Sequence, residues 1–317
     1  MKRNMNKKYF IITIDTEGDN QWKWKPGDSI STNNVDYLDR FQELCNKFSF
    51  KPVWLTNYEI INNDRFVEFV INVETSATGE LGMHLHAWNT PPYYELPRIN
   101  DSAPYLIEYP PDIMEAKIVT MTDAIINRTG FIPTTHRAGR WAMNERYFEL
   151  ILKHGYCTDC SLTPHIDWSN ASGQSQNSKG TNYTSASEKA YSINGILEVP
   201  MSIRMSHHFF KPGISSIRKY LGAAYHSIKG KPVWMRPNGN NYDELVWLSK
   251  RIKYSNSDYL MFMLHSSELM PGGSPTFQSK ESIEKLYEQM EALFTMLSKM
   301  YKGITLRDYS NLVRNQM

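Results

Sequence analysis

The regular alternation of short apolar runs with longer amphipathic segments limits the possible folds of this 317-residue chain more than any other feature. The apolar runs have the length of β-strands, and the amphipathic segments have helical length and periodicity. In residues 281–300, for example, Ile283, Leu286, Tyr287 and Met290 recur at helical spacing. Near-continuously apolar strands that alternate with helices are typical of a parallel sheet covered by helices.

The pattern predicts strands over residues 9–15, 52–56, 82–86, 133–137, 156–161, 196–202, 233–236 and 259–265. It predicts helices over residues 35–48, 65–74, 111–128, 145–154, 214–227, 242–252 and 281–300. Seven or eight such units favour an α/β fold of the distorted (β/α)7-barrel type in a single domain, closed or nearly closed, over an open sheet. No Gly-x-Gly-x-x-Gly follows the first strand, which disfavours a dinucleotide-binding sheet.

The barrel domain is expected over residues 9–312, after a disordered start at residues 1–8 and with loop insertions near residues 88–109 and 162–190. The first residues are basic, but the apolar stretch behind them ends at Ile14. A signal peptide needs a longer apolar region and a small-residue cleavage site, so we expect a cytoplasmic location. The longest apolar runs are also far shorter than the roughly 18 residues of a membrane span, so no integral membrane segment is expected.

Charge and cysteine content exclude further classes. Lys and Arg total 35 against 33 Asp and Glu, and no block of like charge occurs, so no nucleic-acid partner is expected. Three cysteines, Cys45, Cys157 and Cys160, argue against a disulfide framework. The last two have redox or zinc spacing, but without a second pair we favour two thiols on opposite faces of a strand.

Polar side chains gather where the predicted strands end. The residues concerned are Asp15, Glu17, His84, His86, Arg137, Asp159 and His265. Because the carboxyl ends of barrel strands form one face, and that face carries the active site of such folds, we expect these side chains to converge. Asp15 and Glu17 alone could cap a helix, but helical periodicity begins only at Val35.

The residue types form a set suited to metal-assisted hydrolysis of an amide or ester. Two histidines and a carboxylate can hold Zn²⁺ and leave a position for water. Residues two apart in an extended segment point to the same face, so His84 and His86 can reach one ion. A second carboxylate beside an arginine can act as the base, and a histidine on the opposite wall can protonate the leaving group.

At these residues the chain resembles the polysaccharide deacetylases, the NodB-homology or carbohydrate esterase family 4 group. The motif-like segments are Thr13-Ile-Asp-Thr-Glu17, Glu80-Leu-Gly-Met-His-Leu-His86, His136-Arg-Ala-Gly-Arg-Trp141, Thr158-Asp-Cys-Ser-Leu162 with Asp167-Trp168, and Leu264-His-Ser-Ser-Glu268. They follow the family order and span residues 13–268. The resemblance implies a distorted (β/α)7 barrel, which agrees with the alternation of strands and helices.

The resemblance also implies a role for each residue. Asp15 would be the catalytic base, paired with Arg137, and Glu17 and the histidines would bind a divalent metal. His265 would be the general acid, with Leu264 lining the acetyl pocket. The expected substrate-binding residues are Trp88, Trp141, Asp159, Trp168, Leu264 and Glu268. Zn²⁺ is the expected ion, with Co²⁺, Ni²⁺ and Mn²⁺ as alternatives.

Two positions depart from the family pattern. The family spaces its ligand histidines four apart, but Trp88 stands four after His84. Either His86 is the second histidine ligand, which we favour, or His84 binds with one fewer protein ligand. Gly139 stands where many members have proline, so the shape of that loop is not predicted.

The aromatic residues bear on the substrate. Trp22, Trp24, Trp88, Trp141 and Trp168 follow predicted strands, and indole rings either pack against sugar faces or form ordinary wall material. The segment from Arg236 to Asn241 is interpreted as a turn and helix cap rather than as a source of polar contacts.

We therefore expect a metal-dependent hydrolase that removes an N-acetyl or O-acetyl group from a carbohydrate, an amino sugar of a surface polysaccharide or its precursor. The alternatives are an allantoinase-like amidohydrolase acting on a small or cyclic amide, and a non-catalytic glycan-binding protein.

Overall fold

The computed structural model describes residues 8–19, 21–25, 27–210 and 217–315. Residues 1–7 of the expected disordered start lie outside this range, whereas Lys8 is the first residue of a strand. Residues 214–216 of the helix expected at 214–227 also lie outside it.

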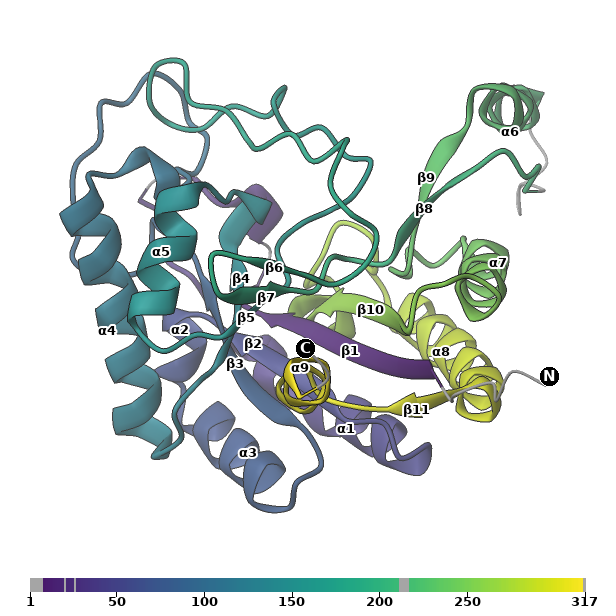
Figure 1. Cartoon of the computed structure of the whole chain (residues 1–317), viewed down its shortest axis with the longest axis horizontal. Coiled ribbons are helices and arrows are strands. Elements are labelled where there is room, and N and C mark those ends of the chain that lie inside the picture. The colour runs from purple at the N-terminus through teal and green to yellow at the C-terminus, as the bar shows by residue number, and fades with distance from the viewer. Residues whose placement is uncertain (1–7, 20, 26, 211–216, 316–317) are drawn as a thin grey trace.

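The helices and strands alternate as the sequence predicts (Figure 1). The strands are β1 Lys8–Thr16, β2 Pro52–Thr56, β3 Glu80–Leu85, β4 Thr135–Ala138, β5 Thr158–Asp159, β6 Tyr191–Ile193, β7 Ile196–Glu198, β8 Ile203–Ser206, β9 Lys231–Trp234, β10 Tyr259–His265 and β11 Tyr301–Gly303. The helices are α1 Leu38–Lys47, α2 Tyr58–Ile61, α3 Asp64–Thr75, α4 Pro111–Thr129, α5 Glu145–Lys153, α6 Ile217–Lys229, α7 Tyr242–Lys253, α8 Lys280–Met300 and α9 Leu306–Arg314. Asn63, Asn144, Ser279 and Thr305 cap α3, α5, α8 and α9 by accepting hydrogen bonds from backbone N–H groups.

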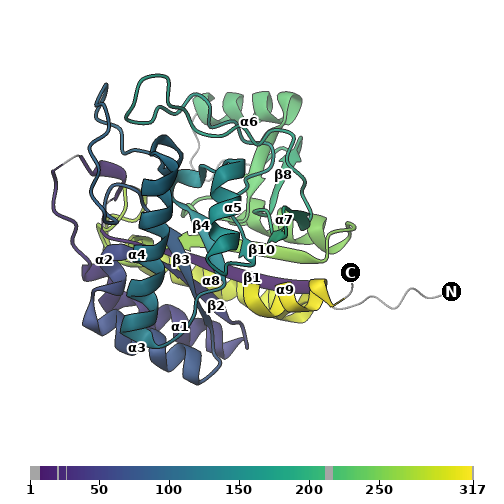
Figure 2. The same ribbon diagram turned by 60° about the vertical axis from the view of Figure 1, so that its left-hand side comes forward.

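The main sheet curls into a half-barrel with the strand order β10-β1-β2-β3-β4-β5-β7-β6, and β11 lies beside β1 (Figures 1 and 2). The strands from β10 to β7 are parallel, and only β6 runs antiparallel to its neighbour. This confirms the predicted distorted (β/α) barrel.

The wall between β7 and β10 is irregular. It is carried by backbone hydrogen bonds from Met201 N to Leu162 O (2.9 Å), from Met235 N to Ser202 O (3.1 Å) and from Met263 N to Met235 O (3.1 Å). Leu197, Val199 and Met201 donate toward β5 and the residues after it, so Pro200, which has no N–H group, lacks a donor for a strand on the other side. We call this stretch the seam.

One strand prediction is wrong. The run over residues 233–236 was expected to be a further parallel strand of the barrel, but β9 pairs antiparallel with β8 in a separate two-stranded ribbon. Just beyond β9, the carbonyl of Met235 accepts a backbone hydrogen bond from Met263 of β10. Strand periodicity alone does not distinguish a ribbon strand from a barrel strand.

The barrel strands are apolar on both faces because each face is buried. Along β1, Ile12 and Ile14 pack with the helices on the outer face, whereas Ile11 packs inside the barrel against residues such as Val53 and Met261. Leu306 and Tyr309 of α9, a helix that the sequence did not predict, join this inner cluster. Since side chains alternate between faces, Thr13, Asp15 and Glu17 point inward with Ile11.

Two long segments, residues 88–105 and 160–190, contain neither a helix nor a strand. The second holds two isolated β-bridges. Both segments cross the carboxyl ends of the barrel strands, the face on which barrel sites lie. Across the described parts of the chain, no helix is both long and apolar enough to cross a lipid bilayer.

Candidate active site

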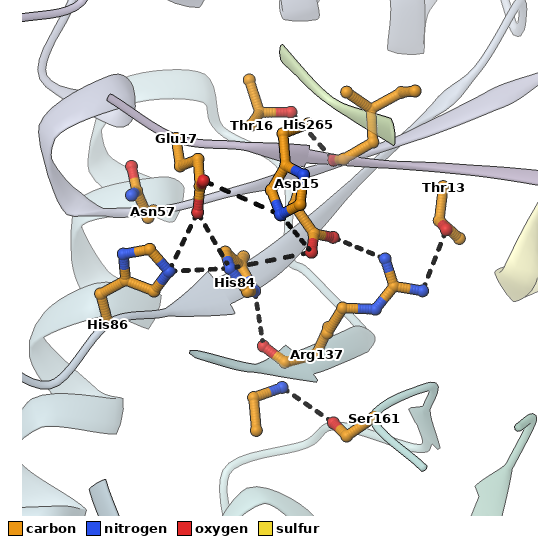
Figure 3. A network of polar contacts seen from close by, with 12 residues as sticks. Thr13, Asp15, Thr16, Glu17, Asn57, His84, His86, Arg137, Ser161 and His265 are labelled. Carbon is orange, nitrogen blue, oxygen red and sulfur yellow. Dashed lines mark hydrogen bonds and ion pairs between the residues drawn. The ribbon is translucent and has the colours of Figure 1, made fainter. Parts of the chain in front are cut away.

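Four strands bring the predicted site residues together at their carboxyl ends (Figure 3). In the parallel register Asp15 of β1 lies beside His265 of β10, and His84 of β3 lies beside Arg137 of β4. Glu17 and His86 follow one residue after the ends of β1 and β3. Because each is an even number of residues from an inward-pointing neighbour, all of these side chains enter the same space.

Glu17, His84 and His86 form a compact group of three potential metal ligands. The two Nε2 atoms are 2.9 Å apart, and they lie 3.5 Å and 3.1 Å from Glu17 Oε2. A tetrahedral ion with bonds of about 2.0–2.1 Å keeps its ligand atoms about 3.3–3.4 Å apart, close to these separations. Among the described residues, this is the only group of three or more such side chains that meets the geometry of a metal site.

The surroundings of the two rings favour a positive charge at this point. Burial of His84 is outweighed by the carboxylates of Asp15 and Glu17, which raise the pKa of His84. His84 Nδ1 lies 3.1 Å from the carbonyl oxygen of Arg137 and donates its proton there, which leaves the Nε2 lone pair directed at the group. His86 Nδ1 is buried without a hydrogen-bond partner among the described residues. Burial lowers the pKa of His86, and the neighbouring His84 lowers it further, so the ring is neutral. Two imidazole nitrogens and one carboxylate oxygen, all buried and aimed at one point, suit a divalent ion such as Zn²⁺.

Asp15 lies beside the three potential metal ligands and forms a buried ion pair with Arg137. Arg137 Nη1 donates to Asp15 Oδ1 at 2.5 Å, while its Nη2 reaches Thr13 Oγ1 at 2.9 Å and its Nε reaches the carbonyl of Cys160 at 3.2 Å. Burial opposes ionisation of Asp15, but the guanidinium and the nearby histidines outweigh it and lower the pKa of Asp15. Its second oxygen, Oδ2, faces the group at 4.0 Å from His84 Nε2.

His265 faces Asp15 and Glu17 from the opposite side. Its Nε2 lies 3.9 Å from Asp15 Oδ2 and 3.9 Å from Glu17 Oε1. Its Nδ1 lies 3.1 Å from Glu268 Oε2 and 3.0 Å from Arg236 Nη2. Arginine only donates, so Nδ1 cannot serve both neighbours. Arg236 and His265 outweigh burial and lower the pKa of Glu268 to about 2, so Glu268 is ionised and can accept from either neighbour.

A cleft of about 480 Å³ opens above these groups. Five tryptophans line it: Trp22, Trp24, Trp88, Trp141 and Trp168. Trp88 stacks on the ring of His86 at 4.2 Å between centroids, and Trp22 meets the ring of His265 edge-on at 4.9 Å. The aromatic walls therefore continue directly to the rings of His86 and His265.

The surroundings of Gly139 explain why the third motif-like segment has glycine where many members of the family have proline. A Cβ atom at this position would lie 2.5 Å from the carbonyl oxygen of Leu85 and 2.7 Å from Cδ2 of His86. The backbone therefore packs against the proposed ligand ring. The next two residues, Arg140 and Trp141, have φ angles of 55° and 62°, a left-handed conformation that is costly for non-glycine residues. The loop thereby directs both side chains into the cleft.

Three predicted substrate-binding residues do not line the cleft. Leu264 is fully buried in the outer cluster, because it neighbours His265 in β10 and so points to the opposite face. Asp159 is also fully buried; it accepts from His136 Nδ1 at 2.6 Å and from Ser161 Oγ at 2.8 Å. Glu268 lies behind His265 and holds its ring. By contrast, Trp88, Trp141 and Trp168 do line the cleft.

Two residues of the site, Arg236 and Glu59, are not predicted from the sequence. Arg236 lines the cleft, although Asn241 Nδ2 also bonds its carbonyl in the expected turn. Its place at the end of a predicted strand was the available signal.

Glu59 of α2 accepts from Gly18 N at 3.0 Å, from Asn57 Nδ2 at 2.5 Å and from Asn89 Nδ2, joining the loops after β1, β2 and β3. Burial raises the pKa of Glu59 to about 7. No spacing in the sequence pointed to this residue.

The thiols of Cys157 and Cys160 are free, as is that of Cys45. Cys160 is buried within the inner cluster of the barrel, and burial raises its pKa well above the ordinary value. The redox or zinc interpretation of the Cys157–Cys160 spacing gains no support from this geometry.

Comparison with models of protein families gives no match to this chain, and comparison with curated proteins gives none either. Solved structures do match it. A protein described as a polysaccharide deacetylase from Mycobacterium smegmatis is 13% identical, with a TM-score of 0.53 over 98% of this chain and 92% of that one.

Two other structures are less similar. A CE4-family pseudoenzyme from Bacillus anthracis is 11% identical, with a TM-score of 0.45 over 95% of this chain and 64% of that one. A variant of the peptidoglycan deacetylase PdaC from Bacillus subtilis is 10% identical, with a TM-score of 0.43 over 99% and 94%. The similarity to the first structure extends over nearly the whole length of both chains. The chain therefore has the NodB-type fold of the polysaccharide deacetylases.

Proposed function

We propose that this protein is a metal-dependent carbohydrate deacetylase. The observation that carries the proposal is the convergence of Glu17, His84 and His86 on one point, with Asp15 and His265 beside them at the bottom of a tryptophan-lined cleft. The cleft can hold a sugar, because sugar C–H faces pack against indole rings. The fold, the donor set and the order of the motif-like segments support the same assignment.

Glu17, His84 and His86 would hold the divalent ion, with Zn²⁺ expected from the two nitrogen donors and one oxygen donor, and Co²⁺, Ni²⁺ and Mn²⁺ as alternatives. When bound, such an ion polarises a carbonyl group and makes a water molecule more acidic. The carbonyl of Arg137 fixes the tautomer of His84, and Gly139 allows the ring of His86 to lie close to the loop after β4.

Asp15 is the proposed base. Arg137 occupies its Oδ1 atom and keeps the carboxylate ionised, so Oδ2 is free to take a proton from the water that attacks the acetyl carbonyl. The new bond joins the water oxygen to the carbonyl carbon. Because the Asp15–Arg137 pair is buried, the base is held in one orientation throughout.

His265 is the proposed acid. Its Nδ1–H group donates to Glu268, which leaves Nε2 facing the cleft. A proton on Nε2 passes to the nitrogen of the sugar as the carbon–nitrogen bond breaks, giving acetate and a free amino sugar. The same groups would release acetate from an oxygen ester, with the proton passing to the sugar oxygen.

The acetylated carbohydrate is proposed to be an amino sugar of a surface polysaccharide or of its precursor. Arg140 and Arg236 add positive charge to the cleft, and Trp88, Trp141 and Trp168 supply faces on which sugar rings can stack. The cytoplasmic location stays a prediction from the sequence.

The experiment is elemental analysis of the purified protein combined with an assay of acetate release from N-acetylated and O-acetylated sugars. We expect a bound divalent metal, and acetate release that is lost on chelation and restored by Zn²⁺. Hydrolysis of a small cyclic amide without acetate release from sugars would favour the amidohydrolase alternative. Glycan binding without turnover by the metal-loaded protein would favour a non-catalytic glycan-binding protein.

A further inference from the structure

Helix α6 stands away from the barrel at the end of the ribbon formed by β8 and β9 (Figures 1 and 2). Each of its residues, all of which the structure describes, is partly or fully exposed. The most exposed apolar side chains are Ile217 (82%), Leu221 (66%), Tyr225 (59%) and Ile228 (76%). At about 100° per residue these four lie within an arc of about 80°, so α6 presents a continuous apolar stripe to solvent.

The same region is strongly basic. No Asp or Glu occurs between Glu198 and Asp243 in the sequence, whereas acidic and basic residues nearly balance over the whole chain. Arg218 and Lys229 lie on the helical wheel beside Tyr225, at the edge of the apolar stripe, and both are exposed. These residues are spaced along the chain, which is why no run of like charge reveals them.

An apolar stripe flanked by basic residues is typical of helices that lie in the interface of a lipid bilayer. Arg and Lys beside such a stripe gain energy from anionic headgroups. A second copy of this chain that met the stripe with its α6 antiparallel would bring the Arg218 and Lys229 residues of both copies together, which like-charge repulsion opposes. A nucleic acid would use the positive charge but leave the apolar stripe uncovered.

We propose that α6 docks this protein on the surface of an anionic lipid bilayer. Ile217, Leu221, Tyr225 and Ile228 enter the interface, while Arg218 and Lys229 contact the headgroups. The proposal does not rest on the deacetylase activity, since membrane binding needs neither metal nor substrate.

The ribbon connects this docking surface to the cleft. At the base of the ribbon, the ring centroid of Trp234 lies 6.1 Å from that of Trp141 and 6.3 Å from that of Trp168. Both Trp141 and Trp168 line the cleft. Both views of the molecule show α6 on the side that carries the long loops over the barrel (Figures 1 and 2). A bilayer bound by α6 therefore lies on the side from which a membrane-borne glycan would reach the cleft.

The test is flotation of the full chain with vesicles of phosphatidylcholine alone and of phosphatidylcholine mixed with phosphatidylglycerol. We expect binding to the anionic vesicles that weakens as salt is added. Each basic charge removed should lower partitioning about fivefold, so Arg218→Glu combined with Lys229→Glu should nearly abolish it. Leu221→Ser combined with Ile228→Ser should reduce binding about tenfold or more, because less apolar surface enters the interface.

Matched controls lie elsewhere on the surface. Ile99→Ser with Ile132→Ser removes two exposed isoleucines, and Lys285→Glu with Lys299→Glu reverses two exposed charges of α8. Both double variants should bind vesicles as the wild type does, with thermal unfolding confirming that all variants fold. Failure of the wild type to float with anionic vesicles, or equal binding by the α6 variants and their controls, would overturn the proposal. A dimer in solution that the serine variants convert to monomers, with vesicle binding unchanged, would show instead that a second copy covers the stripe.

Discussion

Arg137 Nη1 donates to Asp15 Oδ1 at 2.5 Å, and both side chains are buried. The guanidinium offers further bonds to Thr13 and Cys160, so the charged pair is held inside the barrel by several donors and acceptors rather than by one contact. A buried pair of this kind depends on both partners, because either charge left alone is costly.

We expect Arg137→Met to lower the free energy of unfolding by about 3–5 kcal/mol, since it leaves the Asp15 carboxylate buried and uncompensated. The double variant Asp15→Asn with Arg137→Met should regain part of this loss. Without the guanidinium, burial raises the folded-state pKa of Asp15 above the unfolded value, so the folded state binds the proton more tightly and the penalty shrinks as the pH falls. Urea unfolding at several pH values measures both effects. Equal stability of the two variants at neutral pH would contradict this account.

The proposed acid and base predict a second result. Asp15→Asn and His265→Ala should each reduce turnover by about 10²–10⁴-fold, because each removes a group that moves a proton in the reaction. Neither change should alter the circular dichroism spectrum. Acetate release by metal-loaded protein is the measurement, with Arg146→Met, on the exposed face of α5, as the control for loss of a charged side chain outside the cleft. Wild-type rates in either variant would show that the roles are wrong.

The identity of the second histidine ligand can be tested without an activity assay. We expect His86→Ala and His84→Ala to lower metal affinity by orders of magnitude, since each supplies a buried Nε2 to the group. The control is Trp88→Phe. Trp88 lies four residues after His84, where the resemblance would place the second histidine, and this variant should bind metal as the wild type does. Calorimetric titration with Zn²⁺ gives the affinities. Full affinity in His86→Ala would leave His84 as the single histidine ligand.

Gly139→Ala should weaken metal binding while the protein stays folded. The added Cβ atom would press on Cδ2 of His86, and the carbonyl of Leu85 leaves it no room to move away. The control is Gly222→Ala in α6, where a Cβ atom meets nothing within 4 Å; alanine there should be neutral or stabilise by up to about 1 kcal/mol. Zn²⁺ affinity and thermal unfolding, measured together, separate a displaced ligand from a general loss of structure.

The alternation of side chains along strands explains which site predictions succeed. Inward-pointing Asp15, His84, Arg137 and His265 could be expected to meet because parallel strands end at one edge and their polar residues share one face. The same rule, applied strictly, would have placed Leu264 outside the barrel, since it precedes His265 by one residue. It would also have placed Asp159 with His136 on the outer face, because Arg137 and Cys160 point inward.

Other features could not be derived from periodicity. The sequence of β9 reads like that of any barrel strand, and only its pairing with β8 shows that it leaves the sheet. The close approach of Gly139 to His86 depends on two backbone segments that are far apart in the chain. Glu59 joins three loops through hydrogen bonds that no local pattern encodes.

The irregular seam between β7 and β10 divides the barrel wall into a part held by continuous ladders and a part held by isolated hydrogen bonds. The three proposed ligands come from β1 and β3, whose ladders are intact on both sides, whereas the segment that departs from the wall between Ser202 and Met235 interrupts only isolated hydrogen bonds. Material can therefore be added or exchanged at the seam without breaking a ladder that supports the reaction centre. The architecture lets an accessory structure be added without rebuilding the strands that carry the proposed ligands.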